Sequence, residues 1–80
     1  MGNRREQERR RTLKSGKIIF NHRASVVDCL VRNLSAGGAC LQLANVVGVP
    51  QTFDLLIDGV QRSCIIKWTN ANRLGVAFCE

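Results

Sequence analysis

The chain has 80 residues, 45% of them hydrophobic, and therefore forms at most one small domain. No apolar run approaches the ~20 residues of a membrane span. No apolar stretch follows the N-terminal charges as it would in a secretory signal. We therefore expect a cytoplasmic protein without a membrane span.

The positive charge is concentrated near the N-terminus. Seven of the twelve Lys and Arg residues precede Ile18, accompanied only by Glu6 and Glu8, so this segment has a net charge of +5. We interpret residues 1–16 as a flexible basic arm, because they have almost nothing to bury, and residues 17–80 as the folded domain. Composition alone would fit a solvated tail equally well.

Alternating and β-branched runs predict strands through the rest of the chain, and no stretch has sustained helical periodicity. The expected strands are 17–21, 25–34, 39–43, 53–57, 64–68 and 74–78. Asp58-Gly59 favours a type I′ hairpin, because both central residues of that turn need a positive φ. Asn70-Ala71-Asn72 predicts another tight turn, since asparagine tolerates left-handed geometry. Together these elements predict an all-β fold, a six-stranded antiparallel β-barrel.

The alternation along the strands also predicts which faces carry the aromatic residues and the cysteines. All four aromatic residues are expected on inward faces, as core rather than binding surface: Phe20, Phe53, Trp68 and Phe78. The cysteines contain no CxxC pair and the single histidine is not placed to complete a zinc set, so we expect buried free thiols and no metal site. They are Cys29, Cys40, Cys64 and Cys79.

Arg5 and Arg9 form an arginine pair, RxxxR, within the basic arm. A guanidinium group donates two parallel hydrogen bonds to phosphate and keeps its charge at any relevant pH. It also pairs with O6 and N7 of guanine and can stack on a base. The pair is therefore suited to an anionic guanine nucleotide.

A second motif lies between two expected strands, in the segment 33–38 with the sequence NLSAGG. The side chains of Asn33 and Ser35 can hydrogen-bond a base edge or a phosphate. Gly37 and Gly38 let the backbone turn, with positive φ where required, and let a ligand approach closely. In isolation the same residues are also typical of a turn whose Asn and Ser cap their own backbone.

Taken together, the two motifs resemble the binding signature of the PilZ domain family, RxxxR followed by D/NxSxxG. Arg5 and Arg9 match the first element, and Asn33, Ser35 and Gly38 match the second. The end of the chain is similar as well. The segments that resemble the last two strands of the family are Ile66-Lys67-Trp68 and Leu74-Gly75-Val76-Ala77-Phe78.

This resemblance implies a six-stranded barrel that binds cyclic di-GMP, a bacterial second messenger with two guanines and two phosphates. It implies that the arginine arm folds over the nucleotide and that the NxSxxG positions line the barrel side of the site. Arg4, Arg10 and Gly37 are further candidates for contacts, since the arginine cluster allows other registers. We expect no cofactor besides this ligand, and a monomer or weak homodimer that relays the signal to a downstream protein.

Three other functions compete with nucleotide binding. The sequence contains no nucleophile, base and orienting group in a catalytic arrangement, so we expect no enzymatic activity. A nucleic-acid-binding barrel would need outward aromatic platforms beside a basic groove, whereas here the aromatics are expected inward. The stronger alternative is a PilZ-like protein-interaction module with weak or no nucleotide binding.

Overall fold

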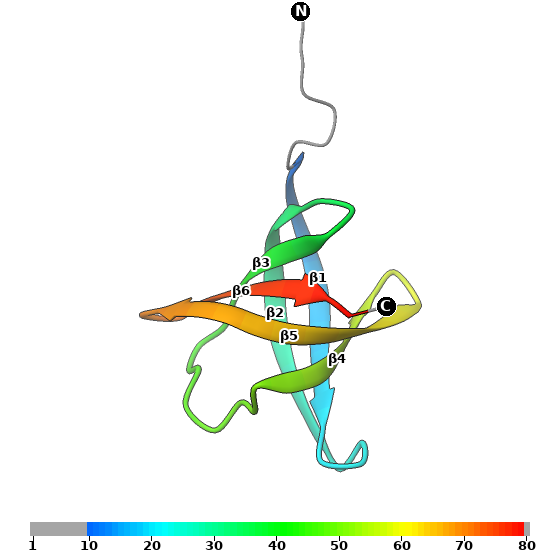
Figure 1. The fold of residues 1–80 in the computed structure, drawn as a ribbon, viewed down its shortest axis with the longest axis vertical. Helices are drawn as coiled ribbons and strands as arrows, with labels where there is room; N and C mark the ends of the chain where they lie inside the picture. The colour runs from blue at the N-terminus through cyan, green and yellow to red at the C-terminus, as the bar shows by residue number, and fades with distance from the viewer. Residues whose placement is uncertain (1–9, 80) are drawn as a thin grey trace, which may run out of the picture.

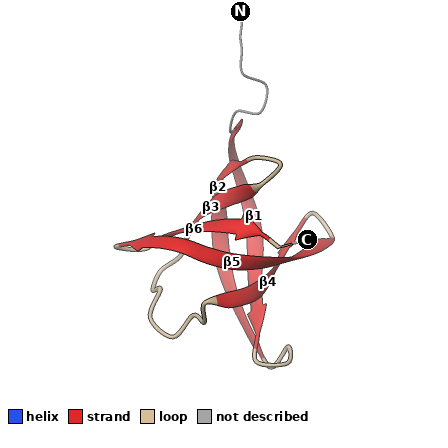
Figure 2. Ribbon diagram, in the orientation of Figure 1, coloured by secondary structure: helices blue, strands red, loops and turns tan. Residues whose placement is uncertain are grey.

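The computed structural model describes residues 10–79, which form six strands and no helix (Figure 2). The strands are β1 (Arg10–Phe20), β2 (Ser25–Leu34), β3 (Gly38–Gln42), β4 (Thr52–Ile57), β5 (Val60–Asn70) and β6 (Arg73–Phe78). They close an antiparallel barrel in the order β1-β2-β3-β6-β5-β4 (Figure 1). The predicted all-β, six-stranded antiparallel barrel is confirmed. Within the described range no helix is long and apolar enough to cross a membrane.

The first strand begins at Arg10, well before the expected start at Lys17. It pairs with β2 from Arg10↔Leu34 to Phe20↔Ser25, and this long hairpin runs along the length of the molecule (Figure 1). Residues 10–16 have few side chains to bury, but strand pairing satisfies their backbone groups all the same, so they belong to the barrel rather than to the arm. Residues 1–9 lie outside the described range, so a flexible arm there stays a prediction.

Both predicted tight turns contain residues with positive φ, but only one has them at the predicted positions. Asp58 and Gly59 have φ values of 52° and 79°, as a type I′ hairpin between β4 and β5 requires. In the β5–β6 turn the residue with positive φ is Ala71, at 53°, rather than either neighbouring asparagine. The β1–β2 turn also contains three consecutive residues with positive φ, 21–23.

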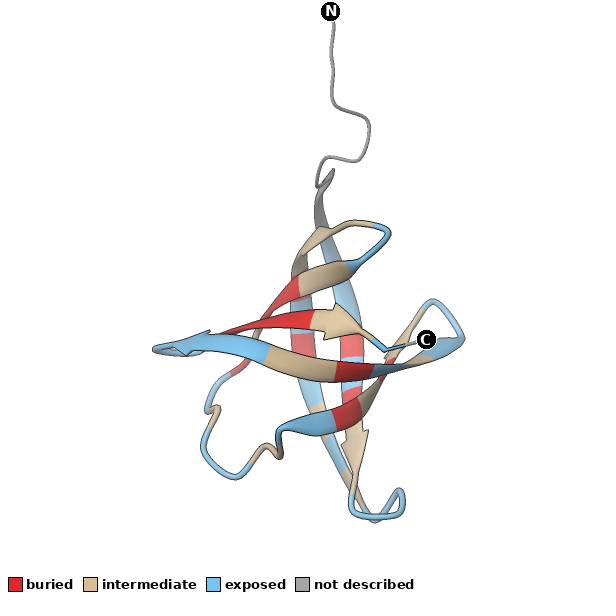
Figure 3. Cartoon of the chain, viewed as in Figure 1, coloured by how far each residue is buried: buried red, intermediate tan, exposed pale blue. Residues whose placement is uncertain are grey.

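The core consists of inward-facing residues from all six strands. Figure 3 shows the buried segments in the middle of the barrel, where the strands cross. The core cluster contains Ile18, Cys29, Val31, Leu41, Leu43, Phe53, Leu55, Cys64, Leu74 and Val76. Phe53 is buried as predicted, and Phe20 and Phe78 pack against the cluster from partly buried positions. The inward prediction for Trp68 is wrong, because 47% of this residue is exposed.

A β-bulge explains the position of Trp68. Ile66 pairs with Val76 but Trp68 pairs with Gly75, so the register shifts at Lys67. One extra residue reverses the face on which every later side chain lies, and simple alternation therefore places Trp68 on the wrong side of the sheet.

A second bulge lies in β2 and acts in the same way. Val31 pairs with Leu41, whereas Asn33 pairs with Cys40, so the register shifts at Arg32. Val31 is buried and Leu34 packs against the core. The bulge therefore leaves Asn33 on the outside of the barrel, on the same face as Trp68.

All four cysteines have free thiols, and three of them are buried while Cys79 is exposed. Burial raises the pKa of Cys29 from 9.0 to about 11, with a further contribution from Asp28. Burial and the neighbouring Cys79 raise the pKa of Cys64 to about 12. These two thiols are therefore protonated at neutral pH. In the described part of the chain no group of three His, Cys, Asp or Glu could hold a metal ion.

Candidate functional site

The NxSxxG turn connects β2 to β3 and is closed by its serine. The Ser35 amide donates a hydrogen bond to the carbonyl oxygen of Gly38 at 2.9 Å, and the Ser35 hydroxyl donates to the same oxygen at 3.2 Å. This is the self-capping geometry that a turn of these residues favours on its own. The hydroxyl oxygen of Ser35 keeps its capacity to accept a hydrogen bond.

The two glycines of the turn serve different purposes, and neither has a positive φ. A Cβ on Gly38 would overlap the carbonyl oxygen of Val76 on β6. A Cβ on Gly37 would meet nothing within 4 Å, and the Gly37 carbonyl accepts a hydrogen bond from the Phe78 amide at 2.8 Å. The turn therefore does not require left-handed geometry at either glycine, and at Gly38 the close approach is made by β6.

The turn borders an open cavity of about 250 Å³ that extends over β3, β6 and β5. Ser35, Gly37 and Gly38 line it on one side, and Lys67 and Trp68 line it on the other. The structure therefore brings three motif positions together with an aromatic residue that lies thirty or more positions later in the chain.

Asn33 belongs to the same surface through a row of paired residues. Across the sheet, Asn33 pairs with Cys40, Cys40 with Gly75, and Gly75 with Trp68. Neighbouring strands lie about 4.8 Å apart, so roughly 14 Å separate the backbone of Asn33 from that of Trp68. The amide and the indole thus stand at opposite ends of one outward-facing row.

The floor of this row is flat because of Gly75. A Cβ at Gly75 would overlap the indole of Trp68, so the ring lies across the glycine. Cys40, the next residue in the row, is only 8% exposed although its position in the register faces outward. The row therefore presents an apolar floor between Asn33 and an exposed aromatic ring, which is the arrangement that a planar base needs for stacking.

The charge at this cavity comes from Lys67, which occupies the bulge of β5 and is exposed. Its ammonium group is a compact positive charge that can meet a phosphate. Sequence analysis missed Lys67, Trp68 and Gly75 as site residues, because regular alternation points Trp68 inward. No local signal could have found them, because regular alternation also places the charge of Lys67 in solvent.

The predicted arginines fall at or beyond the edge of the described range. Arg4, Arg5 and Arg9 lie outside it. Arg10 is the first residue of β1 and pairs with Leu34, and Arg11 pairs with Asn33. The basic segment therefore joins the barrel directly beside the NxSxxG turn.

Comparison with known proteins agrees with this architecture. The sequence profile described as "PilZ domain" matches residues 3–80. A solved structure described as "Crystal structure of PilZ domain of CeSA from cellulose synthesizing bacterium" is similar, with a TM-score of 0.68 at 15% sequence identity, over 91% of this chain and 81% of that one. No curated protein matches the chain. The profile covers nearly all of the sequence and the structural neighbour has the same fold, so the chain belongs to the PilZ domain family.

Proposed function

We propose that this chain is a receptor for cyclic di-GMP that relays the signal to a protein partner. The observation that carries the proposal is the row of paired residues that puts the NxSxxG turn and Trp68 over one cavity. Membership in the PilZ family supports the same ligand, because this is generally a family of cyclic di-GMP receptors whose domains are binding modules rather than enzymes.

On the barrel side, each group has a distinct task. The exposed indole of Trp68 stacks on one guanine, a contact that contributes about 1–3 kcal/mol per base in comparable sites. The amide of Asn33 hydrogen-bonds a base edge, and the Ser35 oxygen accepts a hydrogen bond from a base N–H. Lys67 neutralises part of the phosphate charge.

The arm completes the site from the opposite side. Arg9 immediately precedes Arg10 at the start of β1, and Arg5 lies five residues before it. An extended chain spans at most about 3.5 Å per residue, so the chain length gives Arg5 a reach of up to roughly 18 Å from the start of β1 and Arg9 a reach of roughly 4 Å. Both guanidinium groups can therefore reach a nucleotide at the turn, where they bind phosphate or guanine.

Calorimetric titration with cyclic di-GMP tests the proposal. Arg5→Ala and Arg9→Ala should each weaken binding by about 1.5–3 kcal/mol, the range for hydrogen bonds to charged groups. Trp68→Ala should weaken binding and abolish the change in tryptophan fluorescence on titration. Arg23→Ala, in the exposed β1–β2 turn, is the matched control and should leave the affinity unchanged. Full affinity in the Arg9→Ala protein would refute the role of the arm.

One structural observation favours the alternative function, binding of single-stranded nucleic acid. Its main objection was the lack of an outward aromatic residue, and Trp68 now stands on the outside beside Lys67. Sites for single strands stack several successive bases, however, and this cavity has only one aromatic ring. Competition between cyclic di-GMP and a mixed-sequence oligonucleotide separates the two functions, and we expect the dinucleotide to displace the oligonucleotide.

A further inference from the structure

One half of β2 has a partner on only one side. β1 pairs with β2 along its length, whereas β3 pairs with it only from Leu30 to Leu34. On the β3 side, residues 25–29 have no paired strand within the described chain. Alternate residues of such an edge direct their N–H and C=O groups outward, where another strand can take them up.

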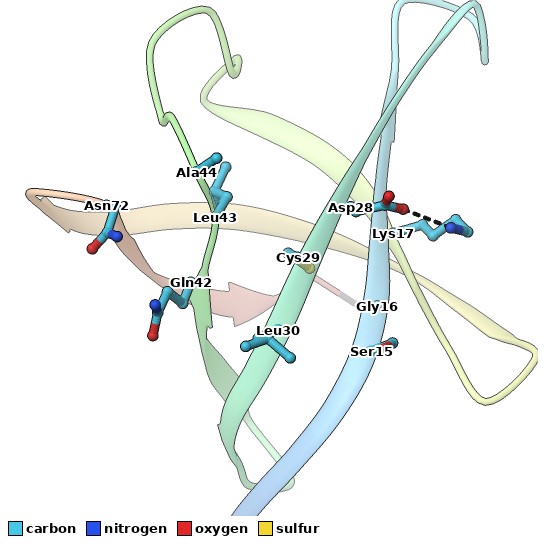
Figure 4. Close-up of a pocket in the computed structure, with 10 residues that line it drawn as sticks. All are labelled: Ser15, Gly16, Lys17, Asp28, Cys29, Leu30, Gln42, Leu43, Ala44 and Asn72. Atoms are coloured by element: carbon cyan, nitrogen blue, oxygen red, sulfur yellow. Dashed lines mark hydrogen bonds and ion pairs between the residues drawn. The ribbon is translucent and has the colours of Figure 1, made fainter.

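The edge is open because the chain leaves β2 after Gln42. The Leu43 amide donates to the carbonyl of Asn72 in the β5–β6 turn at 2.9 Å, which draws the segment after β3 away from β2. The gap is a cavity of about 480 Å³. Figure 4 shows Asp28, Cys29 and Leu30 on one side of it, with Gln42 and Asn72 on the other. This volume lies within the range of about 300–1,000 Å³ that is usual for ligand sites.

The outward face of this edge alternates between apolar and acidic residues. Val26 and Leu30 are 53% and 40% exposed, and Asp28 lies between them. The Asp28 carboxylate accepts a hydrogen bond from the Lys17 ammonium at 2.6 Å, yet 83% of its side chain is exposed. Asp28 can therefore accept a second cation from a strand laid beside β2.

A second copy of this chain fits the edge poorly. An antiparallel pairing of two β2 edges that matches Val26 with Leu30 would put the two Asp28 carboxylates directly opposite each other. Like charges in that position destabilise a strand pair. Moving the two-fold axis to Val27 puts Val26 opposite Asp28, which loses the apolar contact as well. The free edge is instead complementary to a segment that has a basic residue two positions from an apolar one, opposite Asp28 and Val26.

We propose that residues 25–29 of β2 bind an extended peptide segment of a partner protein by β-strand addition. The segment carries a Lys or Arg opposite Asp28 and an apolar residue opposite Val26, and it ends before Leu30, which already pairs with Gln42. Main-chain hydrogen bonds supply most of the affinity, and the two side-chain contacts supply the specificity. The proposal does not depend on nucleotide binding, because the cavity shares no lining residue with the one beside Trp68.

A synthetic peptide with blocked ends, Thr-Val-Thr-Lys-Thr-Val-Thr, is the probe for this edge. Added to the isotope-labelled full chain, it should shift the amide resonances of residues 25–29 saturably and slow their hydrogen exchange. The peptide with Glu in place of Lys should bind roughly threefold more weakly or worse. A version with N-methyl groups on alternate amides should not bind, since it cannot complete the ladder.

Variants of the protein distinguish the two candidate occupants of the β2 edge, which are a partner peptide and a second copy of this chain. Val26→Lys should weaken peptide binding, whereas Val60→Lys, at a similarly exposed valine on β5, should not. The double variant Lys17→Glu/Asp28→Lys keeps an ion pair and should prefer the Glu peptide. The absence of saturable shifts at residues 25–29 with millimolar peptide would overturn the proposal. A dimer that Val26→Lys dissociates, with no peptide binding, would also overturn it by making a second copy the occupant.

Discussion

Trp68 lies across Gly75 on the outside of the barrel, and a side chain on the glycine would occupy the space of the indole ring. The two residues pair across β5 and β6, so the orientation of the ring depends on the missing side chain of its neighbour. The glycine and the tryptophan therefore act as one unit at the candidate site.

Gly75→Ala should displace the indole and cost about 1–3 kcal/mol of unfolding free energy, the usual cost of overpacking. The affinity for cyclic di-GMP should fall about as far as in Trp68→Ala. Denaturant titration and calorimetry measure the two effects. Arg23→Ala, in the exposed β1–β2 turn and away from this cavity, is the control for both measurements. If Gly75→Ala binds like the parent chain, the indole is not the stacking platform.

Gly38→Ala should destabilise the protein more than Gly75→Ala does. The atom that its Cβ would overlap is the backbone carbonyl oxygen of Val76, which cannot turn away as a side chain can. The substitution separates β3 from β6, so the loss should appear as a lower denaturation midpoint even without nucleotide. A normal midpoint together with lost binding would instead assign Gly38 to the ligand alone.

Ala71→Gly should raise the unfolding free energy by about 1 kcal/mol. Ala71 has a φ of 53°, and left-handed geometry costs a residue with a Cβ about 1–2 kcal/mol that glycine avoids. Thermal or urea denaturation measures the gain. Ala24→Gly, in an exposed turn position without positive φ, should lower the stability slightly instead. Equal effects of both substitutions would contradict the assignment of strain to Ala71.

Stability should fall as the pH rises above 9. Folding raises the pKa of Cys29 from 9.0 to about 11 and that of Cys64 to about 12, so the unfolded chain loses these protons first. Each thiol then lowers the unfolding free energy by up to about 1.4 kcal/mol per pH unit between 9 and its folded pKa. Urea denaturation at about pH 8 and about pH 10 measures the drop, and Cys64→Ala should reduce it. An unchanged free energy over this interval would show that these thiols ionise as readily in the folded protein.

Most of the barrel could be predicted from the sequence because its strands alternate regularly and its turns carry local signals. Asp58-Gly59 fixed one hairpin, and the inward runs around Leu41, Leu55 and Leu74 identified the core strands. The position of Trp68 could not be predicted, since a bulge is set by how two strands fit across the sheet. Nothing in the neighbourhood of Lys67 marks the extra residue, and the register of β6 decides it.

The candidate site could be predicted only in part, because some of its residues are neighbours in the fold but not in the sequence. Asn33, Ser35 and Gly38 follow one another along the chain, so a short motif identifies them. Lys67 and Gly75 become their neighbours only through the pairing of β3 with β6 and of β6 with β5. The start of β1 was also missed, because charge does not reveal whether Arg10 and Arg11 have a strand beside them.

The order of the strands has a consequence for the synthesis of this protein. β3 closes onto β6, which is synthesised after the other five described strands, and Gly75 in β6 lies beneath the indole of Trp68. A nascent chain that ends before residue 73 already carries the arginines and the NxSxxG turn, but it has neither a closed barrel nor a surface for stacking. If the proposed function holds, nucleotide can therefore bind at this site only after β6 has been synthesised.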